Sequence, residues 1–162
     1  GLDVRADVRV KCAFETELMG DGNGSDPDND RKINRLGALA ELVVATLLGV
    51  EDQWVECTAD YKALPGDVLT GIQVRSSQKP YGRLLLHPAD HDEHAFVQCR
   101  HHFRGEQPVA VEVIGWTTGL TGKNPSHWWT GKNGLRPCYR VPDEILTPGL
   151  RGLTQWARTY SH

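Results

Sequence analysis

The segment 31–48 constrains the fold of this chain more than any other part of its sequence. Apolar residues recur there at intervals of three and four, the spacing of one face of an α-helix: Ile33, Leu36, Ala40, Val43, Val44 and Leu47. Gly49 follows and predicts the end of the helix, and Asp28, Asn29 or Asp30 is the expected N-cap. Because this apolar stripe is broad, it needs a second layer to pack against.

Short β-type runs separated by turn signals come after this helix. They are Trp54–Cys57, Asp67–Leu69, Ile72–Ser76, Arg83–His87, Ala95–Arg100 and Val109–Trp116. The QKPYG segment, 78–82, is predicted to join two of them as a hairpin loop. The tail 150–160 predicts a final helix whose apolar face packs on the core, with Leu150, Leu153, Trp156 and Ala157 on that face. This order of elements predicts an α/β fold.

Composition places the chain among ordinary globular proteins, with 162 residues of which 39% are hydrophobic and 24% charged. We expect one domain over 1–162, with a loop-rich N-terminal segment at 1–30 and a long loop rich in Gly, Trp and Lys at 117–137. No apolar run approaches the ~18 residues of a membrane span, and the charged first ten residues are unlike a signal peptide. A cytoplasmic location without a membrane is therefore expected.

The net charge of −3 argues against a protein that coats nucleic acid indiscriminately. This net charge is compatible with a local basic groove, because many of the cations lie in the C-terminal two-thirds of the chain. Cations hold phosphates and aromatic rings stack on bases. The candidate contacts to nucleic acid are Lys79, Arg83, Lys123, Trp128 and Lys132. The alternative is that the tryptophans cover the core beneath a long loop.

Four polar residues form the candidate site. In the strand Ile72–Ser76 the side-chain period is two, so Gln73 and Arg75 project together from the face opposite the core. Asp67 precedes a tight turn and would approach the same place from an adjoining strand. At ~100° per residue, Glu41 falls on the edge of the apolar stripe of the helix. Folding could therefore bring all four together.

This set resembles the signature of the PD-(D/E)XK nuclease superfamily. The resemblance covers roughly residues 31–116 and rests on Glu41 in E-x-x-x-A, Asp67 after Pro-Gly, and the Q-x-R segment of Gln73 and Arg75. It implies a restriction-endonuclease-like fold, with an N-terminal helix packed on a central mixed β-sheet and a C-terminal helix. It also implies an endonuclease that hydrolyses DNA phosphodiester bonds with Mg²⁺ or Mn²⁺, as in phage, repair or defence enzymes.

The resemblance assigns a role to each of the four residues. Asp67 would be the principal metal ligand, Gln73 and Glu41 supporting ligands, and Arg75 the cation that orients phosphate or water. Two departures from the family pattern matter. Gln73 replaces a carboxylate, which lowers the expected affinity for Mg²⁺, and Arg75 replaces a lysine and stays protonated, so it cannot act as a base.

Active, weakened and purely binding versions of the fold are all compatible with these departures. The alternative function is a non-catalytic module of the same fold that binds nucleic acid or protein. DNA is the expected partner, with other nucleic acids and a homodimer as further possibilities.

Two other groups of residues could bind metal. His87, His91 and His94 lie among three acids and could hold zinc, although their spacing matches no standard ligand set and a solvated turn is the plainer interpretation. His87 could also carry a proton, because it ends a strand expected to flank the candidate site. The four cysteines are the second group and could form a structural zinc site, although they are scattered without a C-x-x-C pair, as in a protein with reduced thiols.

Overall fold

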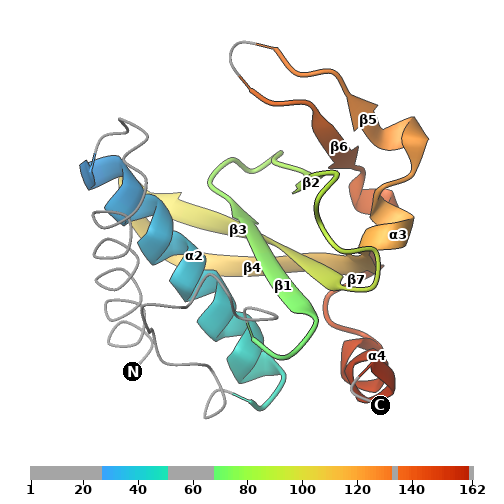
Figure 1. Cartoon of the computed structure of the whole chain (residues 1–162). Helices are drawn as coiled ribbons and strands as arrows, with labels where there is room; N and C mark the ends of the chain where they lie inside the picture. Colours follow the sequence, from blue (N-terminus) through green and yellow to red (C-terminus); the bar gives the residue numbers. More distant parts are fainter. Residues whose placement is uncertain (1–26, 51–67, 133–134, 161–162) are drawn as a thin grey trace.

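The computed structural model describes residues 27–50, 68–132 and 135–160. Its elements are α2 (Pro27–Leu47), β1 (Ile72–Ser77), β2 (Leu84–Leu86), β3 (Ala95–Arg104), β4 (Gln107–Thr118), α3 (Gly119–Gly122), β5 (Trp128–Trp129), β6 (Cys138–Val141), β7 (Thr147–Pro148) and α4 (Leu153–Tyr160), with 3₁₀ turns at Pro125–His127 and Asp143–Ile145. The fold is α/β with a mixed sheet, which confirms the predicted class (Figure 1).

Helix α2 starts earlier than its sequence periodicity indicates. It begins at Pro27, so Asp28, Asn29 and Asp30 lie inside its first turn, and the prediction that one of them is the N-cap is wrong. Proline suits a first turn because the amide hydrogen it lacks would have no partner inside the helix.

The end of α2 agrees with the prediction. Gly49 adopts a positive φ of 71°, and its amide donates to the Thr46 carbonyl at 3.0 Å, while the Val50 amide donates to the Ala45 carbonyl at 2.9 Å. This pair of bonds is the Schellman arrangement, which glycine favours because it has no Cβ to clash in the left-handed region.

The strands form two sheets. The larger has the order β1-β3-β4-β7, in which β1 runs parallel to β3 and the other pairs are antiparallel. The smaller has the antiparallel order β2-β6-β5. Figure 1 shows the β5–β6 hairpin standing away from the larger sheet.

The segment 78–82 is not a hairpin loop, so that prediction is wrong. Strand β1 pairs with β3 and β2 pairs with β6, so this segment carries the chain from one sheet to the other. Side chains of β3 hold the crossover, because the Gly82 carbonyl accepts hydrogen bonds from Gln98 Nε2 at 3.1 Å and from Arg100 Nη2 at 3.0 Å. A Cβ at position 82 would collide with the Ser77 side chain.

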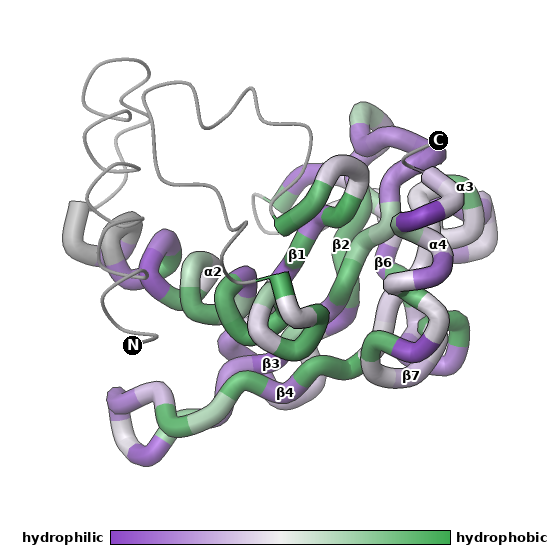
Figure 2. The backbone as a smooth tube through the Cα atoms, turned by 90° about the horizontal axis from the view of Figure 1, so that it is seen from below, coloured by the Kyte–Doolittle hydropathy of each residue, from purple (hydrophilic) through white to green (hydrophobic). Residues whose placement is uncertain are grey.

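The larger sheet separates two hydrophobic cores. The first lies between this sheet and helices α2 and α4, and contains Ala40, Val44, Ile72, Val97 and Leu153 among its buried members. The second lies between its other face and the smaller sheet, and contains Leu84, Leu86, Phe96, Val141 and Leu146. In Figure 2 the hydrophobic part of α2 lies toward β1. The predicted packing of the final helix on the core is confirmed, since Leu153 and Ala157 are buried in the first core.

Three details differ from the expectations. Ile33 and Leu47, predicted to be in the buried stripe of α2, are 48% and 64% exposed. Val68 and Leu69 lie in a bend, not in a strand. The segment 117–137 is not one long loop, because it includes the end of β4, helix α3, a 3₁₀ turn and β5. The N-terminal segment before residue 27 and the predicted strand Trp54–Cys57 lie outside the described residues.

Among the helices that the structure describes, none combines the length and the apolar character required to cross a membrane.

Candidate functional site

Strand β1 presents Gln73 and Arg75 on the same face, as its alternation predicts. Ile72 is fully buried in the helix-side core and Val74 packs against that core. Since successive side chains of a strand point to opposite faces, Gln73 and Arg75 face the layer that contains the second core. In the parallel register Gln73 lies beside Phe96 of β3.

The guanidinium of Arg75 is held by two neighbours. Its Nη2 donates to Asp90 Oδ1 at 2.8 Å, and its Cζ lies 5.4 Å from the centre of the Phe96 ring. Asp90 is itself fixed, because its Oδ2 accepts from the His87 amide at 2.7 Å. The Arg75 side chain is 33% exposed. A positioned cation therefore remains open to solvent at this face.

The amide of Gln73 contacts a buried histidine. Gln73 Nε2 lies 3.5 Å from Nδ1 of His94, a long hydrogen bond in which the amide donates to a neutral imidazole. Burial is the main cause that lowers the pKa of His94, and His91 adds to it, whereas Asp90 and Glu93 oppose it. A lowered pKa favours the neutral ring. The contact leaves the Gln73 Oε1 without a donor from the described residues.

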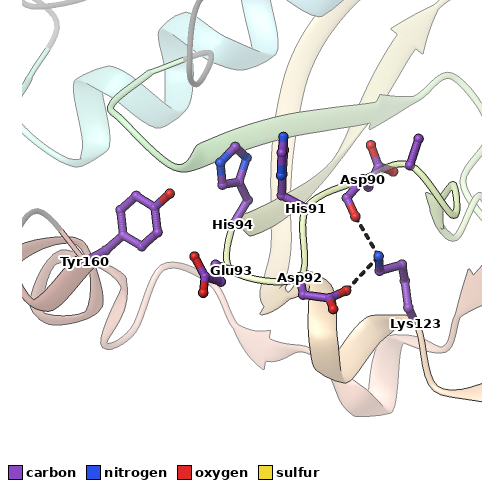
Figure 3. A pocket seen from close by; sticks show the side chains of 8 residues that line it. Asp90, His91, Asp92, Glu93, His94, Lys123 and Tyr160 are labelled. Atoms are coloured by element: carbon purple, nitrogen blue, oxygen red, sulfur yellow. Dashed lines mark hydrogen bonds and ion pairs between the residues drawn. The ribbon is translucent and has the colours of Figure 1, made fainter.

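A pocket of about 360 Å³ lies next to these residues, at the turn before β3. Its lining, shown in Figure 3, comes from the turn, from α4 and from the segment after α3: Ala89, Asp90, His91, Asp92, Glu93, His94, Lys123 and Tyr160. The rings of His91 and His94 lie 4.6 Å apart, and Tyr160 meets His94 edge-on at 6.0 Å. The pocket is polar and holds both signs of charge.

The ammonium group of Lys123 is held by oxygen atoms of the protein itself. Its Nζ lies 2.6 Å from Asp92 Oδ1 and donates to the carbonyls of Asp90 at 2.6 Å and Pro88 at 3.3 Å. With three oxygens around it and a side chain 14% exposed, this ammonium group ties the turn 88–92 to the end of α3. It is a poor candidate for the nucleic-acid contact predicted from the sequence.

The other predicted contacts to nucleic acid are on the surface. Lys79, Arg83 and Lys132 are exposed. Trp128 is 43% exposed, and its ring meets Tyr139 edge-on at 4.9 Å. These four side chains are accessible to a ligand.

Glu41 and Asp67 complete the predicted set of four. Glu41 is only 3% exposed and belongs to the helix layer, on the side of β1 opposite to Gln73 and Arg75. Asp67 lies outside the described residues. The structure thus brings Gln73 and Arg75 together and places Glu41 across the strand from them, while the convergence of all four stays a prediction.

The donor atoms at this face suit a hard cation only in part. Gln73 offers a neutral oxygen, and the carboxylate of Asp90 is taken by Arg75 and by the His87 amide. Within residues 27–50, 68–132 and 135–160, no three His, Cys, Asp or Glu side chains group as a metal would require. His87, His91 and His94, considered above as zinc ligands, therefore do not form such a group.

The cysteines that the structure describes are free and buried. Burial raises the pKa of Cys99 to about 12 and also raises the pKa of Cys138, which Arg140 opposes. Both are therefore protonated thiols and poor metal ligands. Cys12 and Cys57 lie outside the described residues.

The sequence did not single out Asp90 and His94 as partners of Arg75 and Gln73, nor Tyr160 as part of the same pocket. The one usable signal was the high density of histidine and acid in 87–94, which lies just before the strand that pairs with β1. Tyr160 carried no signal, because it reaches the pocket from the end of α4.

Comparisons with models of protein families, with curated proteins and with solved structures find no match to this chain.

Proposed function

We propose that this chain is a divalent-metal-dependent nuclease that hydrolyses phosphodiester bonds of DNA. One observation carries the proposal. A neutral oxygen ligand, Gln73, and a solvent-accessible cation, Arg75, lie two residues apart on one face of β1, and each has a partner in the turn before β3. This arrangement suits the recognition of a charged phosphate beside a metal ion.

Arg75 would bind and orient the phosphate. A guanidinium has five donors in a fixed plane and stays charged at any working pH. Asp90 accepts a hydrogen bond from Nη2 of Arg75, and the Phe96 ring lies against the guanidinium. The remaining donors can therefore meet phosphate oxygens in a set orientation, and they would stabilise charge that develops during displacement.

Asp67 and Gln73 would hold Mg²⁺ or Mn²⁺, with Glu41 as a further ligand. The ion would polarise the phosphodiester and lower the pKa of a bound water. Arg75 would not take the proton of that water, because its guanidinium is already protonated. Because Glu41 and Gln73 lie on opposite sides of β1, a shared ion would have to sit at the margin of this strand. His94 would keep the Gln73 oxygen turned toward the ion by accepting from its Nε2.

The test is cleavage of plasmid DNA with Mg²⁺ or Mn²⁺ by the purified protein and by variants. Asp67→Ala should lower the rate at least about a hundredfold. Gln73→Glu adds a charged ligand and should lower the Mg²⁺ concentration for half-maximal cleavage about tenfold. Gln107→Glu is the matched control, because it adds the same charge at the exposed start of β4. Undiminished cleavage by Asp67→Ala would contradict the assignment.

A second candidate function is a binding module without catalysis. It is favoured by the position of Glu41 across the strand from Gln73 and by the pairing of Arg75 with Asp90. This candidate predicts salt-sensitive DNA binding with no cleavage at any metal concentration.

A further inference from the structure

Strand β2 of the smaller sheet has one buried face and one exposed face. Leu84 and Leu86 belong to the second core and are fully buried, whereas Leu85 between them is 42% exposed. Residues in register on antiparallel strands share a face, and Leu85 is in register with Arg140 of β6. The outer face of this sheet therefore presents an apolar side chain beside a cation.

Cations lie close to aromatic rings on this outer face and in the crossover that leads to β2. Trp129 is in register with Cys138, two residues from Arg140, so it lies on the same face. The Arg140 Cζ lies 5.4 Å from the centre of the Trp129 ring. In the crossover to β2, Lys79 Nζ lies 5.9 Å from the ring of Tyr81, which is 72% exposed. Two cation–aromatic pairs are thus accessible.

The segments that build this sheet contain no acid. The chain has 21 Asp and Glu residues, yet none lies in 68–89 or 113–142, which supply all three strands. Of the seven cations in these segments, Arg75 and Lys123 pair with Asp90 and Asp92. The other five have no ion pair to any carboxylate in the described part of the chain: Lys79, Arg83, Lys132, Arg136 and Arg140.

We propose that this outer face binds a single-stranded segment of DNA. The stacking face is defined as Leu85, Trp129 and Arg140 together with the Lys79–Tyr81 pair. Its cations would meet phosphates and its rings would stack on bases, which are accessible only where they are unpaired. The inference rests on the proposed function, because the crossover that carries Lys79 leads directly from β1 and its Arg75 to β2.

The charge of this surface argues for nucleic acid over a protein partner. Five cations in two acid-free segments, without an ion pair to a carboxylate of the described residues, give a local positive field on a chain of net charge −3. Four of the five residues of the stacking face contribute a ring or a cation, and Leu85 is the aliphatic one. A polyanion with planar rings matches this combination of charge and aromatic surface.

The experiment measures the anisotropy of labelled oligo(dT) of about 20 nucleotides, longer than the roughly 4–16 that single-strand-binding folds cover. EDTA prevents cleavage. Trp129→Ala should weaken binding at least about fivefold, and Trp129→Phe should retain most of the affinity. Arg140→Gln should lower the slope of log affinity against log salt by about 0.7. Circular dichroism of each variant checks the fold.

Arg104→Gln is the matched control, because it removes the same charge at the exposed end of β3, outside the stacking face. Unlabelled duplex of the same length should compete less well than the single strand. Binding that is equal in Trp129→Ala, Arg140→Gln and the control would overturn the inference, as would the absence of any binding at low salt or equal competition by duplex.

The two proposals fail separately. If the stacking variants lose binding but no metal supports cleavage, the stacking face stands and the nuclease proposal falls. If metal-dependent cleavage is lost in Asp67→Ala while the stacking variants bind oligo(dT) normally, the nuclease stands and the stacking face falls.

Discussion

The orientation of the Arg75 guanidinium depends on Asp90, a residue 15 positions further along the chain. Asp90 accepts from Arg75 with one oxygen and from the His87 amide with the other, so the turn before β3 and the guanidinium fix each other. Because both side chains are partly exposed, the pair adds little to stability, about 0–1 kcal/mol for such surface pairs. Its importance lies in the orientation of the cation.

His101 is a buried histidine outside the candidate site. It is 2% exposed on β3, and neither ring nitrogen makes a hydrogen bond within the described residues. Burial lowers its pKa below the ordinary 6.5; the Leu36 backbone lies close enough to oppose this, although not in hydrogen-bonding geometry. The neutral form is therefore the one that fits the fold.

We predict that this histidine makes the protein less stable in acid. Well above pH 6.5 it is neutral in both states and its contribution does not change. As the pH falls below that value, the unfolded state binds the proton first, so the free energy of unfolding decreases until the folded-state pKa is reached. The slope is at most about 1.4 kcal/mol per pH unit.

Urea unfolding at about pH 7.5 and about pH 5 measures this effect. His101→Leu should reduce the difference in unfolding free energy between the two pH values. Val97→Ala, a buried change on the same strand that removes no titrating group, should destabilise the protein equally at both. An unchanged pH difference in His101→Leu would contradict the prediction.

At the scale of elements, the entry into β1 is coupled to the end of α4. Gly71 has a positive φ of 82°, and a Cβ there would lie 2.5 Å from the Tyr160 ring. Its carbonyl accepts from the Ala95 amide at 2.8 Å, which starts the parallel pairing of β1 with β3. This glycine therefore meets a backbone and a packing requirement at once.

We predict that Gly71→Ala lowers the free energy of unfolding by about 1–3 kcal/mol, from left-handed strain and from displacement of Tyr160. Gly105→Ala is the control, because Gly105 has a φ of 62° and nothing within 4 Å of a Cβ. Gly105→Ala should lower the free energy of unfolding by less than Gly71→Ala does. A double variant with Tyr160→Ala separates the backbone strain at position 71 from the displacement of Tyr160. The same loss of unfolding free energy from Gly71→Ala in both backgrounds would show that no contact with Tyr160 is involved.

At the scale of the whole molecule, helices α2 and α4 share one core with the larger sheet. They are separated by more than 100 residues of sequence, yet Leu153 and Val44 are both fully buried in this cluster. Elements that bury the same core lose their packing together, so we expect them to unfold in one transition.

Leu153→Ala tests this coupling. It should cost about 2–5 kcal/mol through the cavity it leaves, and amide exchange should show the loss of protection in α2 as well as in α4. Leu120→Ala, at a side chain 69% exposed, should change stability by less than about 0.5 kcal/mol. Loss of protection confined to α4 would show that the two helices are independent.

The sequence by itself determined the elements whose signals are local. The apolar period predicted α2, Gly49 predicted its end, and alternation predicted that Gln73 and Arg75 share a face of β1. It also predicted the buried face of α4. These features depend on residues a few positions apart, so they can be derived from spacing alone.

Only the tertiary structure decided which strands pair and which side chains meet. It placed β2 in a separate sheet, paired Arg75 with Asp90, and surrounded the Lys123 ammonium group with three oxygens. It also set Arg140 against Trp129 on an exposed face. Such contacts join residues far apart in the chain, where many alternative partners have the same local pattern, and only simultaneous packing of both cores selects among them.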